Sequence, residues 1–300
     1  MNPTPGWVAS GAVCPEHPQS PSVGTCTRCG RFVCAGCRVV SDPVLCRACA
    51  PMAMDPLGIV SAHFSAGATL RNGWRMFITV LPVLLPIAAI FSVPAGLISA
   101  GVESLAVRDS MRATIDSQRV VNFYDALIGL IGDIGALALF VGVAEGKTFT
   151  LGQALKEGTS AWGAVFGARF RGGLITLLFT LLLIVPGIWK GVLLAFVVES
   201  AFRVRGQDAL EYSTSLVTGR WWPVFGVLLL SALVAYVPAM VFGGVMGAVG
   251  ELAHLPVVAI EILTDFGARL ADMLLAAFSL ATFYGLNRTD GRQLPPMTWA

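Results

Sequence analysis

Residues 14–49 read CPEHPQSPSVGTCTRCGRFVCAGCRVVSDPVLCRAC and contain all 7 cysteines of this chain of 300 residues. Together with His17, these cysteines form four pairs with two residues between the partners: Cys14/His17, Cys26/Cys29, Cys34/Cys37 and Cys46/Cys49. Structural zinc takes four nitrogen or sulfur ligands in a tetrahedron. Eight ligand-type side chains therefore predict two closed zinc sites, whose ions are structural rather than catalytic.

The spacing also favours one way of dividing the eight ligands between the two ions. Only four residues separate Cys29 from Cys34, which places the second and third pairs on a predicted hairpin with Gly30 in a turn of positive φ. This hairpin favours a cross-brace, in which Cys14, His17, Cys34 and Cys37 hold one ion and Cys26, Cys29, Cys46 and Cys49 hold the other. Sequential pairing of neighbouring pairs, buried free thiols and redox-active cysteine pairs are the alternatives.

The same 36 residues, from Cys14 to Cys49, resemble the B-box-type zinc finger. The C-x2-H opening and the C-x2-C-x4-C-x2-C centre carry the resemblance. B-boxes usually end in two histidines, and this chain has Cys46 and Cys49 at those positions. The resemblance implies a protein-interaction module and not an enzyme.

The rest of the composition is that of a membrane protein. The chain is 55% hydrophobic and 13% charged, against about 25% charged residues in soluble domains, and its mean hydropathy is +0.74. The net charge of +2 gives no argument for nucleic acid as a partner. Residues 1–13 lack the basic and apolar regions of a signal peptide, so an internal segment is expected to start insertion into the bilayer.

Long uncharged stretches predict an all-α membrane domain of about six transmembrane helices, because about 20 apolar residues cross a bilayer. The predicted spans are 76–101, 123–145, 166–186, 189–205, 223–249 and 266–286. The third and fourth are separated at Val185-Pro186-Gly187-Ile188, since proline interrupts a helix. Residues 256–265 are expected to extend the last helix beyond the bilayer.

The chain is accordingly divided into five parts. They are a disordered lead at 1–13, a two-zinc finger at 14–50, a linker at 51–65, the membrane domain at 66–290 and a tail at 291–300. A weak repeat at 68–77, 151–167 and 206–226 predicts three short amphipathic helices at the inner membrane interface, each leading into a spanning helix.

The positions of Lys and Arg favour a cell-membrane protein with both termini in the cytoplasm. Eleven basic residues fall at the inner ends of the predicted spans and four at the outer ends. The inner set is Arg71, Arg75, Lys147, Lys156, Arg169, Arg171, Arg203, Arg205, Arg220, Arg288 and Arg292, and the outer set is Arg108, Arg112, Arg119 and Lys190. This orientation keeps the cysteines in a reducing compartment, where thiols bind zinc instead of forming disulfides.

A second resemblance covers roughly residues 65–290. Leu183-Ile-Val-Pro-Gly-Ile188, then Glu199, then Gly206-Gln-Asp-Ala-Leu210 and residues 213–219, look like the membrane domain of some bacterial glycerophosphodiester phosphodiesterases. The resemblance implies a bacterial six-helix membrane domain. The soluble catalytic barrel needs about 200 residues or more and has no segment here, so the catalytic activity is not carried over.

Charged residues inside the apolar stretches are candidates for function. Glu261, Asp265, Arg269 and Asp272 fall within about 80° on one face of a helix. They predict either a path for a solute or ion, or an Asp265–Arg269–Asp272 ladder of ion pairs facing neighbouring helices. Asp133 lies near the centre of the second span, and Asp125 is expected at its interface.

These patterns favour a function without catalysis. The sequence has no G-x-S-x-G, no P-loop and no dinucleotide-binding glycine motif. The leading hypothesis is a bilayer-embedded recruitment or regulatory protein whose zinc finger binds a cytoplasmic protein. The alternative is a transporter or channel regulated by the zinc module. A membrane-lipid enzyme rests only on the phosphodiesterase resemblance. A homo-oligomer is compatible with the sequence.

Overall fold

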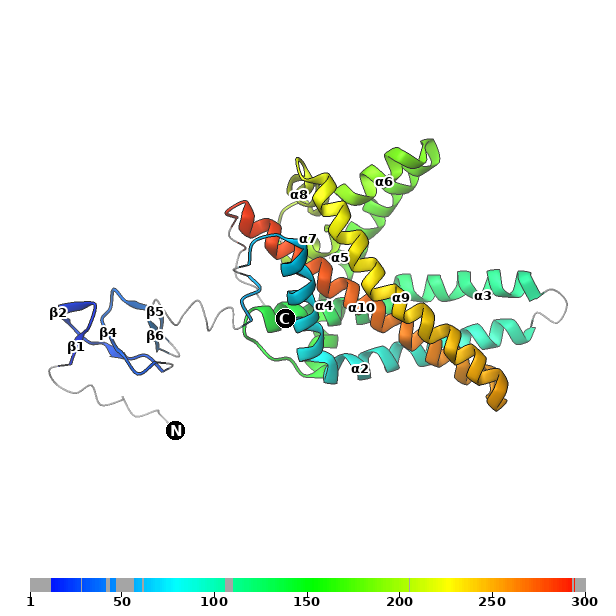
Figure 1. Cartoon of the computed structure of the whole chain (residues 1–300), viewed down its shortest axis with the longest axis horizontal. Coiled ribbons are helices and arrows are strands. Elements are labelled where there is room, and N and C mark those ends of the chain that lie inside the picture. The colour runs from blue at the N-terminus through cyan, green and yellow to red at the C-terminus, as the bar shows by residue number, and fades with distance from the viewer. Residues whose placement is uncertain are drawn as a thin grey trace.

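The computed structural model describes residues 12–27, 29–41, 44–46, 57–60, 62–105, 110–204, 206–292 and 294. Within these ranges, side chains are described except at 39–41, 103–105, 110–116 and 251. A small unit of strands, which we call the Cys/His unit (residues 12–46), stands apart from a larger assembly of helices, the helical unit (residues 57–294) (Figure 1).

The Cys/His unit is built from three short antiparallel pairs of strands. These are β1 (Val13–Cys14) with β2 (His17–Pro21), β3 (Gly24–Thr25) with β4 (Phe32–Val33), and β5 (Arg38–Ser41) with β6 (Val44–Cys46). The predicted hairpin around Gly30 is present between β3 and β4, and the φ angle of Gly30 is +73°. Five of the seven residues in the unit's buried cluster are cysteines, joined by Val33 and Leu45.

Helices make up nearly all of the helical unit. They are α2 (Ala66–Leu105), α3 (Ser110–Tyr124), the π-helical turn η1 (Asp125–Gly129), α4 (Leu130–Ala144), α5 (Leu151–Leu182), α6 (Ile184–Leu193), α7 (Val197–Arg203), α8 (Ala209–Val217), α9 (Trp221–Ala253) and α10 (Val257–Thr289). Six described segments are long and apolar enough to cross a membrane: Ala66–Val102, Ser117–Ala144, Leu151–Leu182, Ile184–Arg203, Trp221–Gly250 and Val257–Thr289. The predicted number of such helices is therefore confirmed.

Two of the three predicted interface helices are not separate elements. The segments 68–77 and 151–167 belong to the continuous helices α2 and α5, whereas Ala209–Val217 does form a short helix of its own, α8. The connection between the second and third spans is also shorter than the predicted spans imply, because Lys156, Arg169 and Arg171, assigned to the inner ends of the spans, all lie within α5. A capping box at Thr150 and Gln153 starts α5 early and leaves only a short connection after α4.

The break between the third and fourth spans lies earlier than predicted. Leu183 is extended, with φ −163° and ψ 141°, and α6 already begins at Ile184. Pro186 therefore sits in the first turn of α6, where its missing N–H costs no helical hydrogen bond. Gly187 lets the hairpin close, since an added Cβ would lie 2.1 Å from Thr180 Oγ1.

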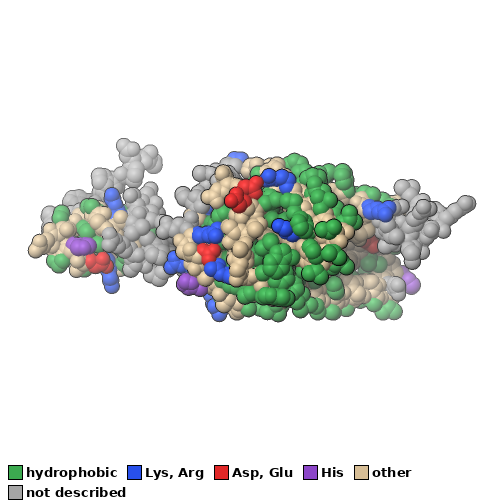
Figure 2. Space-filling model, turned by 90° about the horizontal axis from the view of Figure 1, so that it is seen from above, with side chains coloured by type: hydrophobic (Ala, Val, Ile, Leu, Met, Phe, Trp, Pro, Cys, Tyr) green, Lys and Arg blue, Asp and Glu red, His purple; other side chains and the backbone are tan. Residues whose placement is uncertain are grey.

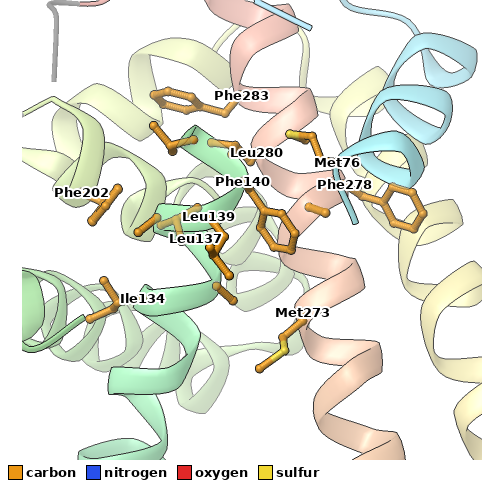
Figure 3. Packing of buried hydrophobic residues seen from close by; sticks show 14 of the residues in the cluster. Met76, Ile134, Leu137, Leu139, Phe140, Phe202, Met273, Phe278, Leu280 and Phe283 are labelled. Atoms are coloured by element: carbon orange, nitrogen blue, oxygen red, sulfur yellow. The ribbon is translucent and has the colours of Figure 1, made fainter. Parts of the chain in front are cut away.

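Helix α4 lies at the centre of the packing in the helical unit. Every residue from Ile134 to Ala144 is buried, as expected of a helix that is apolar on all sides. Phe140 points from α4 toward α10 (Figure 3), and it belongs to the same buried apolar cluster as Phe278 and Leu280 of α10. Helix α10 packs along both α2 and α9, and together these contacts form one continuous apolar core.

Large apolar side chains also cover much of the outside of the helical unit (Figure 2). At the tip of the α5–α6 hairpin, all five residues from Leu181 to Val185 are between 64% and 82% exposed. Soluble monomers rarely expose continuous apolar patches of this kind.

Candidate metal centre and charged cluster

The first metal-ligand cluster combines residues from two separate segments of the Cys/His unit. Cys14 and His17 come from the β1–β2 hairpin, and Cys34 and Cys37 from the turn after β4. The ligand atoms of all four lie within 4.8 Å of one another. The Nδ1 atom of His17 lies 3.5 Å from Cys34 Sγ and 3.2 Å from Cys37 Sγ.

The second cluster is formed by Cys26, Cys29 and Cys46, whose sulfur atoms also lie within 4.8 Å of one another. Cys29 Sγ and Cys46 Sγ are 3.8 Å apart. Cys49, the fourth ligand predicted for this site, lies outside the described residues. The structure thus brings together the first with the third pair, and the second pair with Cys46 of the fourth, as a cross-brace requires.

Both clusters have dimensions that suit a tetrahedral metal ion. Zinc–sulfur bonds of about 2.3 Å place two sulfur ligands about 3.8 Å apart, and a sulfur and a nitrogen ligand about 3.5 Å apart. The distances at Cys29/Cys46 and His17/Cys34 match these values. Two Cys/His clusters could therefore hold metal ions, and their donor atoms are those that zinc prefers.

The backbone prepares the first cluster for thiolates. Backbone N–H groups of Cys34, Glu16 and His17 lower the pKa of the Cys14 thiol to about 6. Burial and the neighbouring Cys14 and Glu16 side chains raise the pKa of the Cys37 thiol to about 12. Several sulfur atoms this close together ionise jointly only beside a cation, and a bound metal ion supplies that charge.

In the helical unit, the predicted ladder of α10 is only partly present. Arg269 is buried and donates from Nε to Asp265 Oδ2 at 2.7 Å, but its second carboxylate partner is Asp125 of η1. Asp272 instead accepts a hydrogen bond of 2.5 Å from the Tyr236 hydroxyl of α9. The sequence could not supply Asp125 as a partner, because it lies 144 residues away along the chain.

The remaining predicted charges also have partners on other helices. Glu261 of α10 accepts a hydrogen bond of 3.2 Å from Ser99 of α2. Asp133 of α4 lies 3.5 Å from Arg169 of α5. Arg169 was counted only among the basic residues at the inner ends of the spans, so the sequence gave no sign of this ion pair within the bundle.

One buried ion pair was missed altogether. Arg203 at the end of α7 donates to Glu145 after α4 at 2.5 Å, and the Arg203 side chain is only 5% exposed. Desolvation by burial raises the pKa of Glu145, while Arg203 opposes this shift. The signal was present in the sequence as an acidic residue at the end of the second apolar stretch and a basic residue at the end of the fourth, but their contact depends on tertiary packing.

Residues of the second resemblance motif have structural roles. The Ser213 hydroxyl donates a hydrogen bond to Leu193 O at 2.9 Å and accepts one from Phe196 N at 3.1 Å. These two bonds stabilise the break between α6 and α7.

The other motif residues lie around α7 and α8. Asp208 caps α8 by accepting from the N–H groups of Leu210 and Glu211. Gly206 has a positive φ of 92°. Glu199 is buried and accepts a hydrogen bond from Ser279.

Comparison of the chain with protein families, with curated proteins and with solved structures finds no match.

Proposed function

We propose that this chain is an integral membrane protein whose Cys/His unit is a zinc-bound, B-box-like interaction module that recruits a cytoplasmic protein. The observation that carries the proposal is the pair of Cys/His clusters on a unit that stands apart from the helices. The described ligands of the first cluster fill a four-coordinate site and leave no position for a substrate, which favours a structural ion over a catalytic one. We therefore propose a function without catalysis.

The Cys/His unit also carries apolar side chains suited to binding a protein. Three apolar side chains of the unit, Val13, Val23 and Phe32, are between 39% and 47% exposed. They are exposed although the buried cluster of the unit contains only two apolar residues besides its cysteines. Apolar and aromatic side chains are the usual anchors of protein interfaces. Phe32, on the strand next to the first cluster, is the anchor we assign.

The metal claim is tested by counting zinc in the purified chain. Two zinc ions per chain are expected, and Cys34→Ser and Cys46→Ser are each expected to lose one ion, from different sites. Cys49→Ser is expected to lose the same ion as Cys46→Ser. Retention of both ions by Cys49→Ser would show that another ligand completes the second site.

Orientation is tested with the cysteines themselves, since all 7 lie in residues 14–49. A membrane-impermeant maleimide should leave intact cells unlabelled and should label the chain after permeabilisation and metal chelation. Labelling of chelator-treated intact cells would place the Cys/His unit on the outer side and contradict the proposal.

Recruitment is tested by crosslinking the full chain in native membranes and quantifying the attached proteins. Phe32→Ala should keep its zinc and lose a specific set of partners, and Cys34→Ser should lose the same set. Gln19→Ala, an exposed position on β2, is the control and should retain them. An identical set of partners for native, Phe32→Ala and Cys34→Ser chains would exclude recruitment by this unit.

A second candidate is a transporter or channel regulated by the Cys/His unit. It is favoured by Asp125, Asp133 and Arg269, which line one cavity between apolar helices, because ionised groups at this depth often mark solute paths. Flux in proteoliposomes should fall in Asp133→Asn and Arg269→Gln. Unchanged flux in both variants would reject this candidate.

A further inference from the structure

A hollow with both polar and apolar walls lies between helices of the helical unit. It has a volume of about 590 Å³, within the range of about 300–1,000 Å³ typical of small-molecule sites. Its walls come mainly from η1, α4, α5 and α10. The residues used below are Asp125, Asp133, Arg169, Phe166, Phe170 and Asp272.

The charged groups around this cavity do not balance. Asp125 and Asp265 share the single guanidinium of Arg269, and Asp133 is paired with Arg169 at 3.5 Å. Asp272 is bonded by the neutral hydroxyl of Tyr236. Among the described side chains that line the cavity, three carboxylates thus face two guanidinium groups, and negative charge is in excess, the more so because Asp265 shares Arg269 from outside the lining.

The unbalanced charge lies deep in the apolar segments. Asp133, Arg169 and Asp272 are each more than ten residues from either end of the segment to which they belong. Yet the side chains of Arg169 and Asp133 are 56% and 43% exposed. Ionised groups at such depth are costly when they face hydrocarbon, so a counter-charge in the cavity would stabilise them.

An aromatic wall stands beside the carboxylates. Phe166 and Phe170 of α5 both line the cavity, with ring centroids 6.1 Å apart, and Phe170 is 61% exposed. Leu174 and Leu177 continue the apolar wall along the same helix. Aromatic faces attract cations, and an inorganic ion would make no use of the leucine surface. The cavity therefore combines the two features that recognise an organic cation with apolar substituents.

We propose that this cavity binds a lipophilic organic cation, with its charged centre between Asp133, Asp272 and the ring of Phe170. The inference goes beyond recruitment by the Cys/His unit. It shares its location with the transport candidate but concerns equilibrium binding alone, so an absence of flux would leave it standing.

The test uses the full chain in lipid nanodiscs and two ions of the same shape and opposite charge. Tetraphenylphosphonium is expected to bind saturably above the level of empty nanodiscs, and tetraphenylborate, measured in separate samples, is expected not to. Equal saturable binding of the borate would show that the cavity selects apolar shape and not charge. Absence of saturable phosphonium binding would also overturn the proposal. Neither outcome depends on a variant that must fold.

Two variants then locate the cation. Asp272→Asn keeps an acceptor for Tyr236 and removes one charge, and should weaken phosphonium binding about tenfold. Phe170→Leu keeps apolar volume and removes the aromatic face, and should weaken it by roughly threefold. Glu261→Gln removes a carboxylate of the same helix that does not line the cavity, and should leave affinity unchanged. Native affinity in Asp272→Asn would overturn the assignment.

Discussion

The two parts of the chain are held together by different means. In the Cys/His unit, five of the seven buried cluster residues are cysteines, and fewer than about 40 residues rarely form a stable core without metal ions or disulfides. In the helical unit, a continuous apolar core includes residues from Ile59, before α2, to Leu286 in α10. The contrast teaches that the Cys/His unit should fold only when its Cys and His side chains bind metal. The stability of the helical unit should instead depend on packing and on how its buried charges are paired.

Removal of metal should give the largest effect and should be confined to one unit. Structural zinc contributes on the order of 10–16 kcal/mol in small fingers, more than the Cys/His unit can replace by burial. A strong chelator, or Cys34→Ser, should expose Arg31 and Arg38 to trypsin. Helix content, measured by circular dichroism, should be unchanged because the described helices all lie in the other unit. Trypsin resistance at both arginines after complete chelation would contradict the claim that bound metal keeps the Cys/His unit folded.

In the helical unit, the largest loss should come from unpairing a buried charge. Arg203→Ala leaves Glu145 without its partner in a site where the Glu145 side chain is 16% exposed, and should cost about 3–5 kcal/mol of unfolding free energy. Arg171→Ala is the matched control, since the Arg171–Asp208 pair is 59% and 43% exposed and should cost about 0–1 kcal/mol. Unfolding by SDS in mixed micelles measures both.

The Arg203→Ala deficit should also depend on pH. Burial raises the pKa of Glu145 above its usual value, so in the variant the carboxyl is destabilising when charged and harmless when protonated. Because the pKa of Glu145 is higher in the folded than in the unfolded chain, its protonated carboxyl favours the folded state below the unfolded pKa of about 4.5. This contribution is lost as the pH rises through the folded pKa. The deficit should therefore shrink as pH falls from 7 toward 4.5. A deficit independent of pH would assign the loss to packing of Arg203 instead.

A packing change should cost less than an unpaired charge. Gly187→Ala would place a Cβ 2.1 Å from Thr180 Oγ1 and 2.7 Å from its Cα at the α5–α6 hairpin, so we expect a loss of about 1–3 kcal/mol. Gly167→Ala, on α5 with nothing within 4 Å of the added Cβ, should be neutral or stabilising by up to about 1 kcal/mol. Equal stability of the two variants would show that the α5–α6 hairpin accommodates the added methyl group without loss of stability.

The sequence predicts local features of this molecule well. The spacing of the ligands predicts which four residues form the first metal cluster, and it predicts the turn at Gly30. Both features depend on a few neighbouring residues. Apolar length gives the number of membrane-length helices. Helix boundaries were less accurate. The break was placed at Pro186, but proline is tolerated in a first helical turn, and the chain breaks at Leu183 instead.

Partners across the bundle could not be predicted from one sequence. The predicted link from Arg269 to Asp272 followed helical spacing, whereas the structure pairs Arg269 with Asp125 and bonds Asp272 to Tyr236. The Arg203–Glu145 pair, and the cavity between α4, α5 and α10, likewise depend on which helices are neighbours. Periodicity within one helix carries no information on that choice.

The smallest expected effect lies at an exposed helix end, where neither metal nor deep burial contributes. Asp208→Ala removes the cap of α8 and should cost about 1 kcal/mol, whereas Asp208→Asn keeps an acceptor and should cost less. The N–H of Glu211, followed by that of Leu210 and by Arg171, lowers the pKa of Asp208. A lowered folded pKa gives stability that is present above about pH 3.8 and is lost as pH falls through the folded value. The difference between native and Asp208→Ala chains in SDS unfolding should therefore vanish in strong acid. A difference that persists there would mean that the side chain stabilises α8 by packing and not as an ionised cap.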